Sequence, residues 1–187
     1  MGLAEYKRKR DFRASAEPGG ETKKTRRARA RFAIQKHDAS SLHYDFRLEM
    51  EGVLKSWAVP KGLPWKKGEK HLAVEVEDHP LDYAGFEGTI PKGQYGGGTV
   101  MVWDRGTYEA EGGEPLKSLR AGRITVQMSG EKAQGEWTLI RLRGTEKKPQ
   151  WLLLKSGESV RPISKKRDDE SVKSGRTMRQ IAKAPVG

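Results

Sequence analysis

The sequence predicts a mainly β protein, an all-β barrel or sandwich flanked by basic arms, and three observations support this class. Short apolar or alternating runs, each as long as one strand, follow one another between residues 31 and 159. Glycine-rich turns separate these runs, and little sequence remains for helices. Lys and Arg concentrate outside this part of the chain, at 1–30 and 160–187. The strand-like runs occupy 32–37, 42–50, 53–59, 71–78, 98–103, 123–129, 136–142 and 151–155.

Three segments outside the predicted strands complete the organisation. Residues 1–30 lack apolar periodicity and contain a Pro18-Gly19-Gly20 break, so we expect a basic arm that is ordered only in part, near Tyr6. The central helical candidate is short, at 114–120. Residues 160–187 are rich in Lys, Arg and Ser and predict a linker or disordered tail with weak helical tendency at its end.

Charge and composition narrow the class of protein. The 187 residues carry a net charge of +12, and the excess lies in the arms, because residues 32–159 hold 18 basic and 18 acidic side chains. Basic arms fit a protein that binds a polyanion, but they fit solvated tails equally well. Cys is absent, which excludes disulfides and thiolate metal sites. Without a secretory signal or an apolar run near the ~20 residues of a membrane span, we expect a cytoplasmic protein.

The run at 41–50 carries the main chemical signal. In a strand, successive side chains point to opposite faces. One face of this run is apolar throughout, which suffices for packing. The other face carries His43, Asp45 and Arg47 at alternate positions, and packing does not require them there.

A further imidazole, that of His37, lies six residues before His43 in the sequence. Two imidazoles and one carboxylate leave coordination positions open and suit Mn²⁺, Fe²⁺ or Zn²⁺. Arg47 adds a planar guanidinium group, whose paired N–H donors can bind two oxygens of a phosphate. The spacing alone leaves two readings about equal: a metal site for a phosphoester, or a solvated sheet face with an Asp–Arg pair and scattered histidines.

A second polar group follows the strand predicted at 71–78. Leu72, Val74 and Val76 form its expected packing face, and His79 lies where the strand ends at Pro80. Placed near the metal, His79 could contact phosphate or protonate a leaving oxygen, and Tyr83 could donate a hydrogen bond.

These motifs together resemble the signature of the 3′-phosphoesterase domain of DNA ligase D. The resemblance extends from about residue 6 to 155, with Gly93, Tyr95 and Trp103 continuing it. It is carried by the runs HDASSLHYDFRL at 37–48, SWAVPKG at 56–62, EDHPLDY at 77–83 and FEGTIP at 86–91.

The resemblance implies a compact β-barrel with short peripheral helices and an active site in a surface crevice. It implies an Mn²⁺-dependent enzyme, or one using another divalent transition metal. Such an enzyme removes a 3′-terminal ribonucleoside from a DNA primer and then the 3′-phosphate. The product is a 3′-hydroxyl that a ligase can seal in non-homologous end joining.

Carried over by position, the resemblance assigns the site residues. The metal ligands are His37, His43 and Asp45. Arg47 and His79 bind the scissile phosphate, and Tyr83 completes the pocket. Substrate contacts further from the metal are assigned to Lys61, Arg10, Asp11 and Glu17.

The implied partners are DNA with 3′-ribonucleotide or 3′-phosphate ends, polymerase and ligase domains, and end-joining proteins at the nucleoid. His71 stands where the family is expected to carry a more basic residue. Two rivals remain: a non-catalytic DNA-binding module and a structural metal site. We expect the arms to add affinity and salt sensitivity rather than chemistry.

Overall fold

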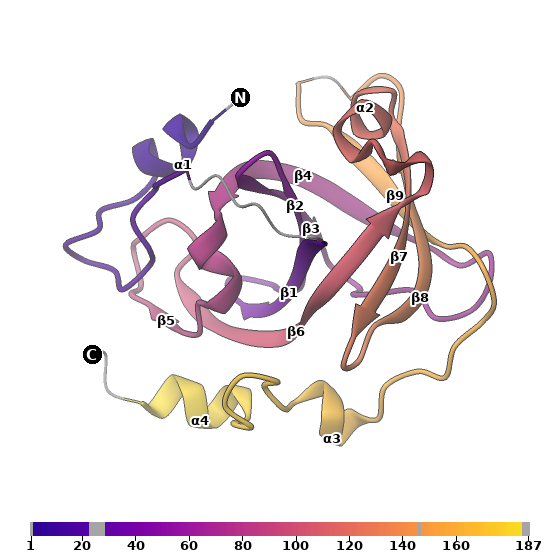
Figure 1. Ribbon diagram of the computed structural model, residues 1–187. Coiled ribbons are helices and arrows are strands. Elements are labelled where there is room, and N and C mark those ends of the chain that lie inside the picture. Colours follow the sequence, from indigo (N-terminus) through magenta and orange to yellow (C-terminus); the bar gives the residue numbers. More distant parts are fainter. Residues whose placement is uncertain (1, 23–28, 146, 185–187) are drawn as a thin grey trace.

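A computed structural model of the chain describes residues 2–22, 29–145 and 147–184 (Figure 1). Nine antiparallel strands form one sheet in the order β1-β2-β3-β4-β9-β8-β7-β6-β5, and pairing of β1 with β6 closes eight of them into a barrel. The predicted β-barrel is therefore confirmed, and the sandwich alternative is excluded. The strands are β1 Ala30–Asp38, β2 Leu42–Met50, β3 Val53–Val59, β4 Lys70–Pro80, β5 Gly88–Ile90, β6 Gly98–Ala110, β7 Arg123–Gly130, β8 Gln134–Arg141 and β9 Gln150–Lys155.

The helices are short and lie outside the barrel, as expected (Figure 1). No helix among the described residues is long and apolar enough to cross a membrane. The α2 helix falls at the central helical candidate, with Pro at its first position, where a missing N–H costs nothing. The helical elements are α1 Ala4–Arg8, η1 Leu81–Gly85, η2 Glu111–Gly113, α2 Pro115–Arg120, α3 Lys165–Asp168 and α4 Met178–Lys183.

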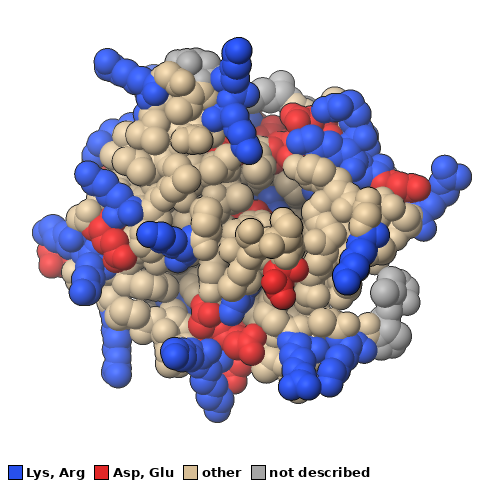
Figure 2. All heavy atoms as spheres, turned by 180° about the vertical axis from the view of Figure 1, so that it is seen from behind, with Lys and Arg blue, Asp and Glu red and all other residues tan. Residues whose placement is uncertain are grey.

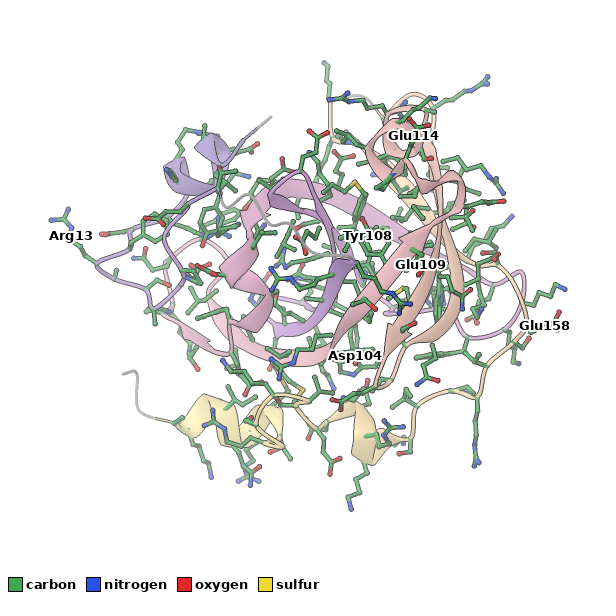
Figure 3. All side chains as sticks on the ribbon, in the orientation of Figure 1. Arg13, Asp104, Tyr108, Glu109, Glu114 and Glu158 are labelled. Atoms are coloured by element: carbon green, nitrogen blue, oxygen red, sulfur yellow. The ribbon has the colours of Figure 1, made fainter. Side chains whose placement is uncertain are left out.

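Large aromatic side chains fill the barrel. Phe46 on β2, Trp57 on β3 and Trp151 on β9 are almost fully buried in one apolar cluster. The two tryptophan rings meet edge to face, with centroids 5.8 Å apart. Tyr108 also points into the barrel, where its hydroxyl donates to a backbone carbonyl, whereas Glu158 projects from the surface (Figure 3).

A second apolar cluster covers part of the outer face of the sheet at β1–β3. Tyr6 of α1, Leu54 of β3 and Tyr83 of η1 belong to it. The polar face predicted for β2 is consequently buried: Asp45 and Arg47 are only 7% and 2% exposed. The solvated-face reading of these residues is therefore wrong, because both faces of this strand lie under other parts of the chain.

Strand β4 has the opposite orientation to the one expected. Ala73 points into the barrel and is fully buried, whereas Leu72 is 40% exposed and Val74 and Val76 are half-buried on the outer face. The expected packing face is therefore the outward one. The strand also continues to Pro80, which pairs with Val53.

The C-terminal segment differs from the linker or disordered tail that its composition predicted for 160–187. Residues 160–184 run along the outside of the barrel through α3 and α4 (Figure 1). Ile181 joins the main core cluster, and a capping box formed by Thr177 and Gln180 begins α4. Asp168 accepts hydrogen bonds from Lys36 and Tyr44.

Candidate metal centre and phosphate site

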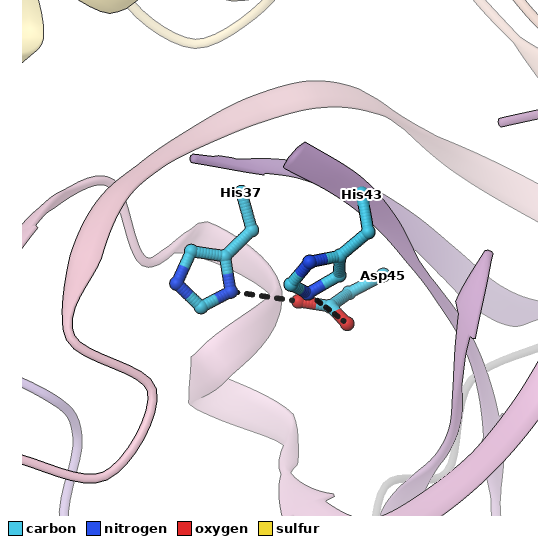
Figure 4. A group of neighbouring side chains, drawn as sticks. All are labelled: His37, His43 and Asp45. Atoms are coloured by element: carbon cyan, nitrogen blue, oxygen red, sulfur yellow. Dashed lines mark ion pairs between the residues drawn. The ribbon is translucent and has the colours of Figure 1, made fainter. Parts of the chain in front are cut away.

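Three side chains converge at the ends of the first two strands. His37 and His43 face each other as partners in the β1–β2 ladder, and Asp45 lies two residues further along β2. The Asp45 carboxylate lies 3.4 Å from Nδ1 of His37 and 3.4 Å from Nε2 of His43 (Figure 4). The three potential ligand atoms lie within 4.8 Å of one another, which is close enough to hold one ion.

Backbone carbonyls orient both imidazoles. Nε2–H of His37 donates to the Gly96 carbonyl at 2.7 Å, and Nδ1–H of His43 donates to the Ser41 carbonyl at 3.0 Å. Since a carbonyl only accepts, the proton of each neutral ring must lie on that side. The nitrogens that face Asp45 then carry lone pairs. Metal-ligating histidines are oriented in this way in proteins, so the donor set fits a divalent transition metal.

The charge balance keeps Asp45 ionised. Burial alone would raise the pKa of its carboxyl, but the Arg47 guanidinium and the two imidazoles outweigh burial and hold the pKa well below its usual range. For His43, burial lowers the pKa, but the Asp45 carboxylate outweighs this and leaves the pKa raised. An anionic ligand is therefore available over the physiological pH range.

Arg47 is fixed beside this carboxylate. Its Nε donates to Gln35 at 2.7 Å and its Nη1 to Ser56 at 2.8 Å, and its Nη2 lies 3.4 Å from Asp45. The Tyr83 ring lies against the guanidinium, with its centroid 4.9 Å away. Two of the five N–H donors remain for a ligand. Arg47 is thus a rigid cation at the edge of the candidate metal site.

A second arginine reaches the site from the N-terminal arm. Arg10 donates through Nη2 to Nε2 of His79 at 3.1 Å and through Nη1 to the Glu77 carboxylate at 3.1 Å. Its Nε binds Glu17 at 2.8 Å, and its guanidinium stacks on Tyr6 at 4.0 Å. The arm is therefore attached through its most buried cation.

His79 is neutral in this arrangement. Its Nδ1–H donates to the Glu77 backbone carbonyl at 2.9 Å, so its Nε2 is the acceptor that Arg10 binds. Burial and the charges of Arg47 and Arg10 place its pKa well below the usual value. Glu77 orients the His79 ring. It does so through its carbonyl, while the carboxylate binds Arg10.

Tyr83 lines the pocket, whereas Glu17 is buried and does not line it. The Tyr83 hydroxyl donates to Glu17 at 2.8 Å. Burial, followed by the Glu17 charge, raises the pKa of this phenol well above its ordinary value. The Gln35 amide donates to the carbonyls of Tyr83 and Phe86, and thereby holds η1 against β1.

Most residues predicted for the site border one pocket of about 220 Å³, but four polar residues singled out in the sequence do not line it. Glu17 is buried beside Arg10 and Tyr83, to which it is hydrogen-bonded. Lys61 is exposed in the turn after β3, and Asp11 accepts from the Arg13 amide in an exposed part of the arm. His71 bonds to Gly62 and Glu69 on another part of β4. The pocket is lined by Arg10, His37, Ala39, His43, Asp45, Arg47, Ala58, Val76, Glu77, His79, Tyr83, Ile90, Tyr95 and Gly96.

Sequence reasoning missed several members of this site. The amide of Gln35 joins Arg47 to η1, a link between distant segments that the sequence pattern does not indicate. The glycine-rich segment around Gly96 is indeed a turn, but it also supplies the carbonyl that orients His37. Ser56 gave no local signal, because its role arises only from pairing with Arg47 across two strands.

The sequence of this chain is similar to that of a known protein family. A family model described as the DNA ligase D 3′-phosphoesterase domain covers residues 35–141. A multifunctional non-homologous end joining protein from Pseudomonas aeruginosa is 50% identical over 182 residues, which cover 94% of this chain and 22% of the relative. A DNA repair protein of the same description from Mycobacterium tuberculosis is 46% identical over 142 residues, covering 76% of this chain and 18% of its own.

A third relative, from Mycolicibacterium smegmatis, is 41% identical over 167 residues, which cover 86% of this chain and 21% of the relative. The chain thus spans about a fifth of the length of these relatives. The family match covers more than half of the chain and includes the strands that carry His37, His43, Asp45 and Arg47. This chain therefore belongs to the DNA ligase D 3′-phosphoesterase domain family.

Proposed function

We propose that this domain is a metal-dependent phosphoesterase that repairs DNA 3′ ends. It removes a terminal ribonucleoside and then the remaining 3′-phosphate, and leaves a 3′-hydroxyl. The observation that carries the proposal is the convergence of two lone-pair imidazole nitrogens and a low-pKa carboxylate beside a fixed guanidinium. Metal ligands next to a rigid cation suit a phosphoester better than an uncharged substrate.

In this proposal His37, His43 and Asp45 hold the metal ion, with Mn²⁺ as the first candidate. A divalent ion bound there supplies Lewis-acid polarisation of a phosphoryl oxygen and lowers the pKa of bound water. The protein contributes the ligand geometry. The carbonyls of Gly96 and Ser41 keep both imidazoles in the tautomer that a metal requires.

The two arginines bind the substrate phosphate in this mechanism. Arg47 is held by Gln35 and Ser56, so its remaining donors are oriented before the substrate arrives. Arg10 is held by Glu17 and Glu77 from the opposite wall. Preorganised donors of this kind stabilise charge that develops in the transition state without reorganisation during the reaction.

His79 positions Arg10 rather than donating a proton in the resting site. Its only proton is on Nδ1 and is bonded to the Glu77 carbonyl, so Nε2 has none to give. Tyr83 keeps its phenolic proton and holds Glu17, so it shapes the pocket and does not act as a nucleophile.

The names of the relatives suggest the cellular process in which this domain works, and that process is also part of the proposal. Their names describe multifunctional end-joining proteins, so we propose that this domain works with polymerase and ligase activities at DNA ends near the nucleoid. Asp11 and Lys61 lie outside the pocket. In this proposal they are placed to contact DNA beyond the reacting phosphate.

The decisive experiment uses a labelled primer–template whose primer ends in one ribonucleotide, with Mn²⁺ and with or without a chelator. We expect stepwise conversion to the 3′-phosphate and then to the 3′-hydroxyl, and no conversion with chelator. Asp45→Asn should reduce both steps by more than the ~10- to 100-fold that loss of an outer-shell partner costs. His71→Ala is the control, because that imidazole bonds elsewhere.

Binding without cleavage across several divalent metals would favour the rival function, a non-catalytic DNA-binding module. A structural metal site predicts instead that chelation unfolds the protein. Thermal unfolding followed by circular dichroism, with and without chelator, separates these cases. A silenced but folded protein in chelator supports the catalytic proposal.

A further inference from the structure

The metal pocket continues into a larger hollow on the outer face of β3 and β4. This hollow has a volume of about 830 Å³. It shares four lining residues with the metal pocket: Ala58, Val76, Glu77 and Tyr95. The two spaces are therefore neighbours, and a ligand chain held at the metal would reach the hollow past Glu77 and Tyr95. We name it the β3–β4 hollow.

The floor of the β3–β4 hollow is apolar. Ala58 of β3 and Val74 and Val76 of β4 form it, and Leu72 continues the same outward face with 40% exposure. A strand that faces solvent normally carries polar side chains there. A half-exposed apolar floor beside a charged pocket therefore indicates a surface that is covered when the protein is in use.

The far rim of the hollow is basic. Lys147 and Lys148, in the loop before β9, are exposed and line it. Four acidic side chains line the hollow, and each has a partner. Glu77 binds Arg10 and Asp78 binds Lys55 at 2.9 Å, while Glu5 pairs with Lys9 and Glu75 accepts a hydrogen bond from Trp151. An incoming anion consequently meets Lys147 and Lys148 away from the metal.

Tyr95 stands at the junction of the two spaces. Its side chain is among the most exposed large apolar groups in the described chain, at 45%. Lys9 and Arg10 lie on the ring at 4.8 and 5.4 Å, and the hydroxyl makes only long contacts of 3.4 Å to Lys9 and 3.5 Å to Glu77. These cations cover part of the ring, and its 45% exposure leaves the rest open to a planar group.

We propose that the β3–β4 hollow binds the DNA strand on the 5′ side of the scissile phosphate. The terminal base of that strand stacks on Tyr95, its sugar lies on Val74 and Val76, and a preceding phosphate reaches Lys147 or Lys148. Aromatic stacking combined with cations is how proteins bind nucleic-acid strands without reading sequence. This inference rests on the proposed function and adds the direction of the strand.

The charges around the two hollows indicate in which direction the DNA strand runs. The strand upstream carries a phosphate at every nucleotide, so it suits the side with the exposed lysine pair. The leaving ribonucleoside carries no phosphate once it departs. On the other side of the metal pocket a hollow of about 640 Å³ shares Ala39, Ile90 and Gly96 with it, and only Lys92 among its lining residues is basic. That space suits an uncharged nucleoside.

The test compares Tyr95→Ala, Tyr95→Phe and a Lys147→Ala/Lys148→Ala double variant of the whole chain. A Lys66→Ala/Lys67→Ala double variant is the matched control, because it removes an equally exposed pair from another loop. Fluorescence anisotropy measures the binding of a primer–template with a 3′-phosphate in chelator. Steady-state kinetics with Mn²⁺ then gives a separate KM for each substrate, the ribonucleoside end and the phosphate end.

We expect Tyr95→Ala to weaken binding by about 5-fold or more, as loss of one stacked base does, and Tyr95→Phe to change it little. KM should rise for both kinds of end in Tyr95→Ala and in the Lys147→Ala/Lys148→Ala variant. The control pair should behave as the wild type. A KM rise confined to ribonucleoside ends would overturn the proposal, because the hollow would then hold the leaving group.

Unchanged binding in all variants would also overturn it. Failure of the proposed function looks different. In that case Tyr95-dependent binding would persist in chelator, while the wild type would cleave neither end with any metal. Tyr95 is exposed, so its replacement should leave the fold intact, which circular dichroism checks.

Discussion

Arg47 connects several parts of the candidate site through one side chain. Its fork contacts Gln35, Ser56 and Asp45 at the same time, and it is 2% exposed. A lysine would keep the charge but could not reproduce a planar, multiply bonded fork. The residue therefore combines its proposed role in substrate binding with hydrogen bonds that connect β1, β2 and β3.

We predict that Arg47→Lys lowers kcat/KM on a 3′-phosphate end by roughly 100- to 1000-fold, the usual cost of losing a preorganised donor. Steady-state kinetics with Mn²⁺ measures the effect. Lys66→Ala provides the comparison, because Lys66 is an exposed cation to which the proposed function gives no role. Near-normal kcat/KM in the R47K variant would rule out a role for the planar guanidinium group.

The C-terminal segment acts as an element of the fold. Lys173 donates to the Gly85 carbonyl at 2.6 Å, and Ser174 donates to Glu87 at 2.5 Å. These contacts hold the connection between η1 and β5, and η1 carries Tyr83. The site wall is thus supported from behind by a segment whose composition suggested a tail. Removing 160–187 should therefore disturb the barrel as well as reduce charge.

Ile181 provides the stability test at this scale. It is 1% exposed within the main core cluster, so Ile181→Ala should lower the free energy of unfolding by about 2–5 kcal/mol. Denaturant unfolding measures the change. Arg179→Ala, on an exposed position of the same helix, should stay within about 0.5 kcal/mol of the wild type. Equal stability of both variants would mean that α4 is not packed in solution.

Asp168 makes the same segment sensitive to acid. Burial would raise its carboxyl pKa, but hydrogen bonds from Lys36, Tyr44 and Trp103 outweigh burial and lower the pKa below its ordinary value. A carboxyl with a depressed folded pKa contributes stability above its unfolded pKa, about 3.9. That contribution is lost as pH falls through the folded pKa.

We therefore expect Asp168→Asn to destabilise the protein by about 1–3 kcal/mol at neutral pH, because it weakens hydrogen bonds to a charged group. The difference from the wild type should shrink as pH falls below about 4. Urea unfolding at several pH values tests this. Glu158→Gln, at an exposed surface position, should show no such trend. A constant difference across pH would disprove the linkage.

At the scale of the whole molecule, positive charge is spread out rather than gathered in one patch on the face seen in Figure 2. Figure 2 shows Lys and Arg side chains distributed over a whole face, with Asp and Glu between them. The net charge of +12 arises from the N- and C-terminal segments. Such a distribution suits weak, sequence-independent attraction to DNA.

We predict that a Lys165→Gln/Lys166→Gln/Arg179→Gln variant binds DNA with a weaker salt dependence and an unchanged kcat. The slope of log K against log salt should become shallower by up to about 0.9 for each phosphate that the variant no longer neutralises. Anisotropy titrations at several salt concentrations provide the slope. An unchanged slope would mean that these exposed side chains are only a solvated surface.

Local patterns in the chain were sufficient to predict the strands of the barrel and the candidate metal-ligand triad. Alternation along 41–50 shows which side chains share a face, and a shared face is local information. The spacing of His43 and Asp45 was therefore enough to place them on one face. A single β-hairpin then brings His37 next to them. The eight predicted runs each contain a strand, and only the short β5 was missed among the described residues.

The three-dimensional packing alone sets which face of each strand is inside and which distant residues meet. The outer face of β1–β3 is buried by α1 and η1, and on β4 small Ala73 faces the core while Leu72 faces out. Arg10 reaches His79 across 69 positions of sequence. Periodicity carries no information on such contacts, because they depend on how the closed barrel brings strand ends and arms together in space.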